Sequence, residues 1–191
     1  QNSANIEFRN SCVTLKNLTI DGGVAWIDRP FQTDDGYENY RTLRASTRHG
    51  IGLYSCGKSK ILNVVVKNCH AGYFISDCVN VTITNSRSEY TLGDGVFITG
   101  SSNTILVKNH RCVNVDDDSY TAIAYKVDSV PENILFLNCY SYNGFGALAT
   151  LLGCYNAKVY GCSTNNCRFT PFKLGNHEAF NVNGSHQIVY N

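Results

Sequence analysis

Short runs of alternating apolar and polar residues recur along this chain, and each run ends in Asn or Gly. The clearest lie between Asn63 and Cys112, where VVVKN, VTITN and ILVKN return in the same form. Val, Ile, Thr and Phe dominate these runs and the alternation has a period of two, which is typical of β-strands rather than helices. Self-similarity of this kind indicates a solenoid. We therefore predict a parallel β-helix, in which one coil stacks on the next.

Aligning the runs gives two apolar columns and one closing column. Because alternate residues of a strand share a face, we expect both apolar columns to point into the core. Asn and Gly tolerate the left-handed backbone of a tight corner, and stacked Asn amides can hydrogen-bond along a ladder. The three predicted columns are Leu18, Val64, Val81, Ile105, Ile134 and Ala157; then Ile20, Val66, Ile83, Val107, Phe136 and Val159; then Gly22, Asn68, Asn85, Asn109, Asn138 and Gly161.

The spacing between runs is uneven, so we expect corners that carry loops of variable length. Leu18 and Val64 lie 46 residues apart, twice the step of 23 from Asn80 to Asn103, which predicts one further coil between them. Parallel crossovers are right-handed in nearly all proteins. The predicted fold class is all-β, a single-stranded right-handed parallel β-helix (solenoid) of about seven to eight coils. Residues 1–191 form one β-helix domain. We expect it to be a fragment of a longer chain, because it lacks an initial Met and neither end shows a polar cap.

Two segments depart from the repeat. Residues 24–48 contain the only Trp, two Tyr, two adjacent Asp and four Arg, and residues 113–121 contain three successive Asp. Long excursions from a rigid scaffold often carry function. We therefore expect loops at both places, and we look for a site beside them.

Composition excludes several classes of function. Lys and Arg number 16 against 15 Asp and Glu, whereas a nucleic-acid surface would carry a clear basic excess, so we expect no nucleic-acid partner. No apolar run approaches the length of a transmembrane helix, so we expect no membrane insertion. No CxxC…CxxC pair occurs, so we expect no zinc site, no other metal and no cofactor.

The nine cysteines recur at particular coil positions. A recurring small residue suits a buried stack, and free Cys packs as a small hydrophobe. We expect stacked free thiols, which favour folding in a reducing cytosol. The alternative is a secreted disulfide scaffold with one thiol left over. Cys69, Cys139 and Cys162 directly follow a closing Asn or Gly, as Ser86 does, and Cys56, Cys78 and Cys154 fall near a second shared corner.

The pattern N-V-x-I-x-N-C, together with G-Φ-x-Φ strands, resembles the right-handed β-helices of the pectin-lyase-like superfamily from about Asn17 to Tyr190. That superfamily includes pectate lyases, polygalacturonases, mannuronan epimerases and the tailspikes of bacteriophages. The polygalacturonase series N-T-D, G-D-D and G-H-G is not present in order, and the epimerase signature D-P-H-E is absent. The resemblance therefore implies a fold and a polysaccharide substrate, but it transfers no catalytic residue by motif.

The corner before the G-Φ-x-Φ strands holds the candidate acids. Asp94 lies at this corner in one coil, and Asp117 and Asp118 lie there in the next. Neighbouring strands are about 4.8 Å apart, and glycosidases need two carboxyls about 5 Å or about 6.5–9.5 Å apart. Asp94 paired with Asp117 or Asp118 meets these spacings. The alternative is ordinary turn chemistry, because Asp before Gly is common in turns.

His49 and His70 lie at the same edge. They are candidates for a general base or for binding a substrate carboxylate, and the alternative is two corner histidines without a partner. In the lyases of the resembled superfamily a basic residue neutralises the uronate or abstracts its proton. The resemblance gives that role to Lys126 or Lys173, which sit within or after strands near this edge.

The 24–48 excursion carries the candidate binding residues. Trp26, Tyr37 and Tyr40 offer aromatic faces that stack on the C–H surfaces of pyranose rings. Arg41 and Arg44 can hold a carboxylate or phosphate bidentately. The alternative is that the loop folds onto the helix and buries its own aromatic residues.

These expectations combine in one hypothesis. The chain is part of a bacteriophage tailspike or appendage, located in the virion, that binds and depolymerises a bacterial surface polysaccharide. Tailspikes of the resembled class are trimers, so we expect a homotrimer in the parent protein. The alternatives are a secreted polysaccharide lyase, hydrolase or epimerase, and a non-catalytic adhesin or structural fibre.

Overall fold

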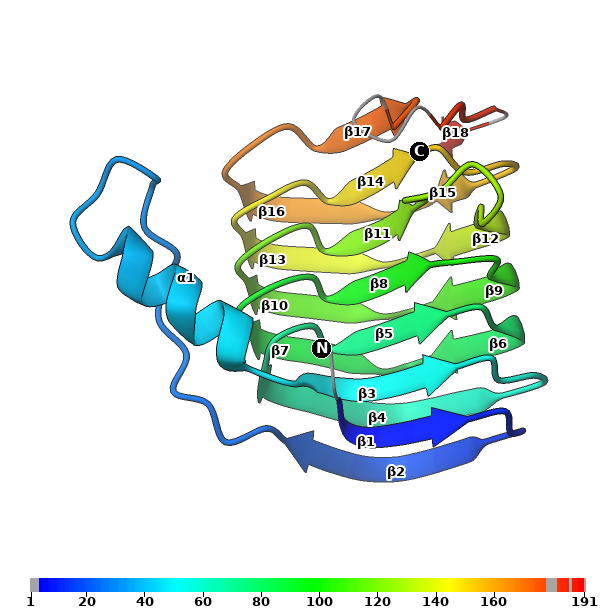
Figure 1. Cartoon of the computed structure of the whole chain (residues 1–191), viewed down its shortest axis with the longest axis horizontal. Coiled ribbons are helices and arrows are strands. Elements are labelled where there is room, and N and C mark those ends of the chain that lie inside the picture. The colour runs from blue at the N-terminus through cyan, green and yellow to red at the C-terminus, as the bar shows by residue number, and fades with distance from the viewer. Residues whose placement is uncertain (1–3, 178–181, 186, 191) are drawn as a thin grey trace.

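The predicted β-helix is confirmed in a computed structural model of the chain, which describes residues 4–177, 182–185 and 187–190. One sheet of seven parallel strands forms the face seen at the front of Figure 1, with one strand from each coil. The described chain therefore has seven coils. In spatial order the strands of this sheet are β1 (Ala4–Arg9), β3 (His49–Tyr54), β5 (Tyr73–Ser76), β8 (Val96–Thr99), β11 (Tyr120–Ile123), β14 (Ala149–Leu152) and β17 (Phe172–Gly175).

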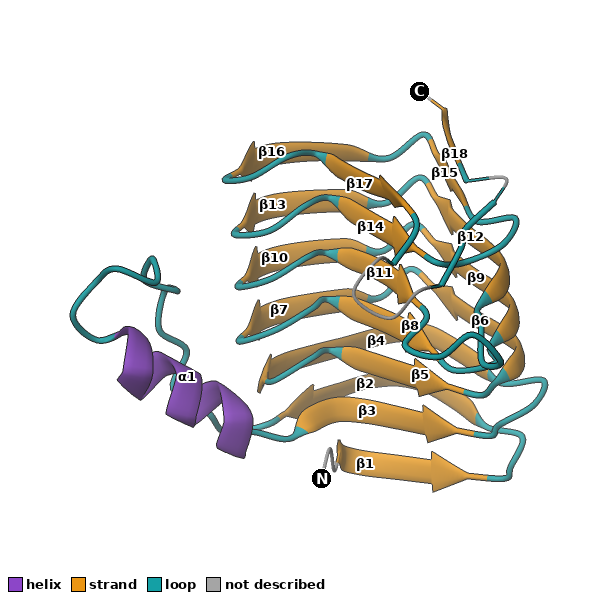
Figure 2. Ribbon diagram, turned by 45° about the horizontal axis from the view of Figure 1, so that its top comes forward, coloured by secondary structure: helices purple, strands orange, loops and turns teal. Residues whose placement is uncertain are grey.

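The remaining strands form a larger parallel sheet that wraps the other sides of the coil (Figure 2). β4 is long enough to pair with β6 through its first half and with β7 through its second half. Later coils therefore have two strands where β2 and β4 have one. The strands are β2 (Thr14–Asp21), β4 (Lys60–Cys69), β6 (Val79–Thr84), β7 (Arg87–Thr91), β9 (Asn103–Lys108), β10 (Arg111–Val115), β12 (Glu132–Leu137), β13 (Tyr140–Gly144), β15 (Lys158–Tyr160), β16 (Ser163–Cys167) and β18 (Ile188–Tyr190).

The register corrects the predicted columns at β4. Ile83 pairs with Ile61, not with Val66, so the stack that continues through Val107 and Phe136 does not contain Val66. The same shift of register removes Val64 from the stack of Val81, Ile105 and Ile134. Val64 pairs with Leu18 below and lies beside Ser86 above. The prediction joined two different stacks because the same motif, N-Φ-x-Φ-x-N, occurs both in the second half of β4 and in β6, which belong to different stacks. Only the packing of complete coils distinguishes them.

A second correction concerns the spacing of 46 residues. β2 pairs directly with β4, so no coil lies between Leu18 and Val64. The extra residues are the excursion 24–48, called the arm below, which contains the one helix of the described chain, α1 (Tyr37–Ser46). Figure 1 shows the arm standing beside one edge of the coils. Residues 113–121 form no comparable excursion, because they span the end of β10, a short corner and the start of β11.

The predicted asparagine corner lies on the large sheet. Asn85, Asn109 and Asn138 all have a left-handed backbone, with φ between 51° and 52°, and the Asn109 side-chain amide donates to Oδ1 of Asn85 at 3.1 Å. Gly161 continues the column at φ 60°, where a Cβ would lie 2.5 Å from Oδ1 of Asn138. The Asn109 amide therefore bonds across to the neighbouring coil, at a corner where Asn tolerates the left-handed backbone.

The core is a continuous stack of buried Val, Ile, Leu, Phe and Cys side chains along the coil axis. All nine cysteines lie in the described residues as free thiols. The Cys56 and Cys139 backbone N–H groups each donate to the sulfur of a cysteine one coil away, Cys78 and Cys162, at 3.3 Å. Cys69 lies outside the Cys139 stack, because it pairs with Thr91. In the described part of the chain, no helix is both long enough and apolar enough to cross a membrane.

Candidate functional site

An acidic corner joins the large sheet to the seven-stranded sheet. Val96 and Tyr120 are register partners in that sheet, and Asp94 and Asp118 each lie two residues before them. Backbone hydrogen bonds continue the pairing into the corner, where the Gly95 N–H donates to the Asp118 carbonyl at 3.2 Å. The structure therefore places Asp94 and Asp118 at equivalent positions of adjacent coils, the arrangement expected from the sequence.

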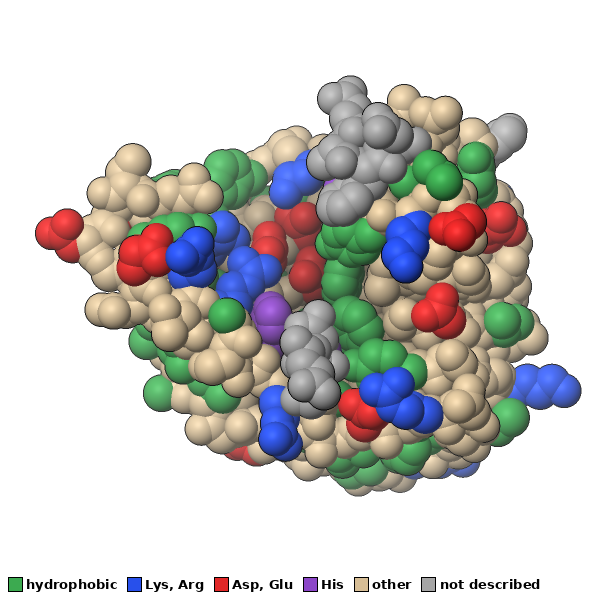
Figure 3. Space-filling model, viewed as in Figure 1, with side chains coloured by type: hydrophobic (Ala, Val, Ile, Leu, Met, Phe, Trp, Pro, Cys, Tyr) green, Lys and Arg blue, Asp and Glu red, His purple; other side chains and the backbone are tan. Residues whose placement is uncertain are grey.

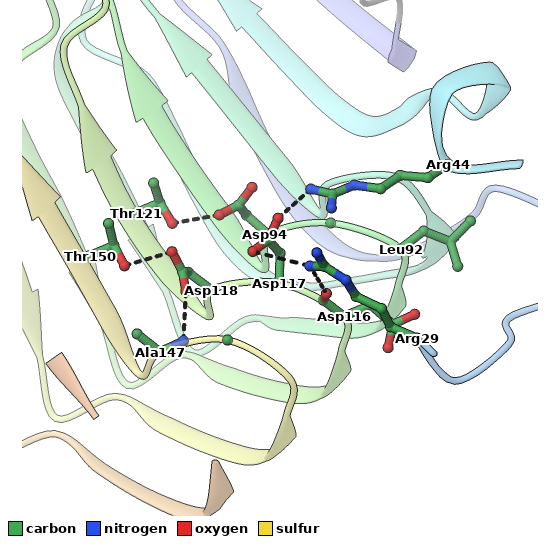
Figure 4. Close-up of polar contacts among 12 residues, drawn as sticks. Arg29, Arg44, Leu92, Asp94, Asp116, Asp117, Asp118, Thr121, Ala147 and Thr150 are labelled. Atoms are coloured by element: carbon green, nitrogen blue, oxygen red, sulfur yellow. Dashed lines mark hydrogen bonds and ion pairs between the residues drawn. The ribbon is translucent and has the colours of Figure 1, made fainter. Parts of the chain in front are cut away.

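The two carboxyls are held in the same way, each by a threonine of the next coil (Figure 4). Thr121 donates to Asp94 Oδ1 at 2.5 Å, and Thr150 donates to Asp118 Oδ2 at 2.6 Å. Thr121 and Thr150 are themselves register partners on β11 and β14. Their outward position is the variable one in the G-Φ-x-Φ pattern, so the sequence analysis could have found them.

Asp118 is the more heavily bonded of the two. Besides Thr150, it accepts from the Ala147 N–H at 2.6 Å and from Lys173 Nζ at 2.9 Å, and its residue is 6% exposed. These donors account for both of its oxygens. Asp118 is therefore a fixed anion with little room to contact a substrate.

Asp117, the neighbouring acid, faces the arm. It forms an ion pair with Arg44 of α1 and a longer one with Arg29, at 3.7 Å. Its side chain keeps 27% of its surface exposed. Figure 4 shows Asp94 and Asp117 close together, with Arg44 reaching them from the arm. Asp117 is thus an ionised carboxylate that remains open to the cleft.

Asp94 behaves oppositely. Burial raises the pKa of Asp94 well above its ordinary value, and the negative charges of Asp117 and Asp118 raise it further. Like charges that lie close together repel, which favours the protonated form of Asp94. The corner therefore presents a carboxyl with a raised pKa beside an ion-paired carboxylate.

The predicted histidines lie on the floor of the same cleft. His49 stacks between Phe74, at a ring-centroid distance of 4.4 Å, and His70, at 5.1 Å. Burial lowers the pKa of His49 to about 4, and burial together with Arg44 lowers the pKa of His70 to about 3. Both rings are neutral near neutral pH, which disfavours them as bases and as cations for a carboxylate.

These residues enclose a cleft of about 350 Å³. Figure 3 shows basic, acidic and histidine side chains gathered there, next to a strip of hydrophobic side chains on the seven-stranded sheet. The strip is an aromatic series from successive coils, Tyr54, Phe74, Phe97 and Tyr125, with ring centroids 5.5, 5.3 and 6.2 Å apart. The cleft is lined by Arg44, His49, His70, Ala71, Asp94, Phe97, Asp117, Asp118, Ile123 and Tyr125.

Most of the predicted arm residues lie elsewhere. Tyr40 is 1% exposed and its hydroxyl donates to the Leu92 carbonyl at 2.8 Å, and Tyr37 stacks on Tyr40. Trp26 packs edge-on against Tyr90. These rings attach the arm to the coils, which matches the alternative given for them above.

The predicted cations divide in the same way. Arg41 pairs with Glu38 on the exposed side of α1, whereas Arg44, one turn further along the helix, enters the cleft. Lys126 lines a separate small cavity near Asp77. Lys173 does reach the acidic corner, through Asp118.

The coiled parallel sheets and this corner define a right-handed parallel β-helix protein with a site on its seven-stranded face. A family model described as "Periplasmic copper-binding protein (NosD)" matches residues 3–187, so the chain belongs to that family. Separate comparisons with curated proteins and with solved structures each gave no match.

Proposed function

We propose that this chain binds a polysaccharide along its seven-stranded face and hydrolyses it in the acidic cleft. One observation carries the proposal: Asp94, a carboxyl with a raised pKa, lies in the same solvent-open cleft as Asp117, which is ion-paired with Arg44. A carboxyl with a raised pKa beside a second carboxylate is the arrangement that a glycosidase uses as its acid and base.

Each residue then has a role. Asp94 donates its proton to the glycosidic oxygen as the bond to the leaving sugar breaks. Asp117, held by Arg44, removes the proton of the attacking water. Asp118 acts as a positioning residue, because its charge raises the pKa of Asp94 while its own oxygens are occupied by Thr150, Ala147 and Lys173.

The aromatic strip supports a polymeric substrate. Its four rings belong to four successive coils: Phe97 and Tyr125 line the cleft, and the buried Phe74 joins them to Tyr54. Aromatic faces stack on the apolar faces of sugar rings, and a strip of this length exceeds one sugar unit, since coils repeat every 4.8 Å or so. A bacterial surface polysaccharide, the predicted substrate, is the class that we propose.

Copper, the metal in the family's name, does not fit the described residues of this chain. The sequence has no Met, and the described residues contain no group of three or more His, Cys, Asp or Glu arranged to hold a metal. His49 and His70 stack with 24° between their ring planes, so their lone pairs lie in nearly parallel planes and do not converge. The proposed reaction therefore uses only the side chains of this chain.

The family's name includes the word periplasmic, and we propose a location outside the cytoplasm. Burial raises the pKa of both Cys69 and Cys112 to about 12, and since thiolates are the reactive form, these two thiols resist oxidation there. Assembly into a homotrimeric bacteriophage appendage stays a prediction, and so does a purely adhesive role.

The test is to incubate the protein with a panel of bacterial surface polysaccharides and to measure depolymerisation as the appearance of new reducing ends. Asp94→Asn and Asp117→Asn should each lower the rate by about 100-fold or more with unchanged melting. The matched control is Asp128→Asn, the same change at an exposed position outside the cleft. Because Asp94 must carry a proton, the wild-type rate should fall as the pH rises through its pKa.

Full activity in both cleft variants would eliminate the carboxylate pair. Unsaturated uronate products in place of new hydrolytic ends would indicate a lyase. Binding without cleavage by the wild type would leave the adhesive role.

A further inference from the structure

A second cavity, of about 600 Å³, lies on the other side of Asp117 from the acidic cleft. The arm forms one wall, with Phe31 and Gln32, and the corners before β14 and β17 form the other, with Phe145 and Phe169. Asp117 lines both cavities, so the two are neighbours.

Three phenylalanines from three parts of the chain converge there. Phe145 is buried, and its ring lies 5.7 Å from that of Phe31 and 5.3 Å from that of Phe169. Phe31 and Phe169 remain 54% and 53% exposed. Exposed phenylalanines that gather around a cavity mark a surface that binds something flat and partly apolar.

The arm wall is fixed in place. The Arg29 guanidinium lies over the Phe145 ring at 4.6 Å and donates to the Asp116 carbonyl at 3.1 Å. Arg168, next to Phe169, pairs with Asp28 of the arm at 2.6 Å. The cavity is therefore built into the fold and needs no closing motion.

We propose that this cavity is a subsite for an uncharged pyranose of the polysaccharide, an inference that rests on the function proposed above. The phenylalanine rings supply stacking faces, and Gln32 and Thr33 supply an amide and a hydroxyl for sugar hydroxyls.

The charge state of the lining selects a neutral sugar. Each cation among the described lining residues already has a carboxylate partner, Arg29 with Asp117 and Lys173 with Asp118. A uronate would have to break one of these pairs, whereas an uncharged ring needs none of them.

The position of the subsite also suits a chain that runs along the coil axis. Phe145 precedes β14 and Phe169 precedes β17, whereas Asp94 precedes β8. The phenylalanine corners of the subsite therefore lie two to three coils from the acid, or roughly 10–14 Å along the axis, while Asp117 forms its near end. It would hold a sugar beyond the cleaved bond rather than at it.

The experiment measures binding to an array of neutral and uronate-containing bacterial polysaccharides, in an Asp94→Asn background. Phe31→Ala and Phe169→Ala should each weaken binding to neutral members by about tenfold. Both side chains are more than half exposed, so the variants should fold. Tyr142→Ala is the control, because it removes an exposed ring from β13 on the large sheet.

The outcomes separate this inference from the proposed hydrolysis. Unchanged binding in both phenylalanine variants overturns the subsite even if the wild type cleaves. Weakened binding in both variants, with no cleavage by the wild type, supports the subsite and removes the hydrolysis. Weakening confined to uronate-containing members overturns the neutral-sugar assignment. A wild type that binds no member of the array counts against both.

Discussion

Two corners of the same coil share one spacing and have opposite chemistry. At the asparagine corner, the same residue repeats in successive coils, as at Asn85, Asn109 and Asn138. At the acidic corner the equivalent positions change from coil to coil: His49, Ala71, Asp94, Asp118 and Ala147 occupy them in turn. The repeated asparagines stabilise the stacking of the coils, whereas the varied residues of the acidic corner form the candidate site.

The difference follows from what each side chain can do every 4.8 Å or so. An amide donates and accepts, so a column of Asn bonds to itself. A carboxylate only accepts, so a column of Asp repels itself and needs partners from outside. Arg44 supplies one from the arm, Lys173 supplies another from β17, and Asp94 retains a proton. The asparagine corner is self-sufficient, whereas the acidic corner depends on distant residues.

The largest expected loss of stability comes from a substitution in the core that both corners share. Ile83 is fully buried between Ile61 and Val107. Ile83→Asp would put an unpaired charge into a stack that has no water, so no folded protein should form. Circular dichroism and melting of the soluble fraction test this. Ile83→Val is the control and should cost about 1 kcal/mol. A soluble Asp variant with wild-type melting would show that the column faces solvent.

The next largest expected effect is on the pH dependence of stability, and it arises at the acidic corner. Burial, and then the charge of Asp28, raises the pKa of Asp116 to about 7. A carboxyl whose pKa rises on folding stabilises the fold fully below its unfolded pKa of about 4, and that contribution is lost as the pH rises through 7. Asp116→Asn should therefore be more stable than the wild type at pH 8, by roughly 2–4 kcal/mol, and similar to it at pH 4.

Urea unfolding at several pH values measures the Asp116 effect. Asp35→Asn, at an exposed position of the arm, is the matched control and should leave the pH dependence unchanged. Parallel stability curves for Asp116→Asn and the wild type would refute the assignment of a raised pKa.

The smallest effect lies at the asparagine corner. Asn109→Ala should cost about 1–2 kcal/mol, because Ala tolerates φ 51° poorly and loses the hydrogen bond to Asn85. Asn109→Gly keeps the backbone and loses only the amide, so it should cost less. Thermal melting of the two variants separates the cost of the left-handed backbone from the cost of the lost hydrogen bond. Equal destabilisation by Ala and Gly would mean that the left-handed backbone contributes nothing.

The sequence by itself determined the coil. Alternating Val, Ile and Thr with closing Asn specify strand, corner and parallel stacking, because these preferences are local and repeat in every coil. The sequence also placed Asp94 and Asp118 at equivalent corners, because each precedes a strand with the same residue pattern and such strands stack on each other.

Only the tertiary structure decided the register at β4, because one local motif closes two kinds of strand and nothing within it says which. It also decided that Arg44 enters the cleft while Arg41 does not, and that Tyr40 anchors the arm instead of binding a ligand. The tertiary structure also decided which charged groups lie near the carboxyls of the acidic corner, and so the direction in which the pKa of Asp94 shifts. Arg44 and Asp117 are 73 residues apart in the chain, and a pKa responds to distance in space, which the repeat does not encode.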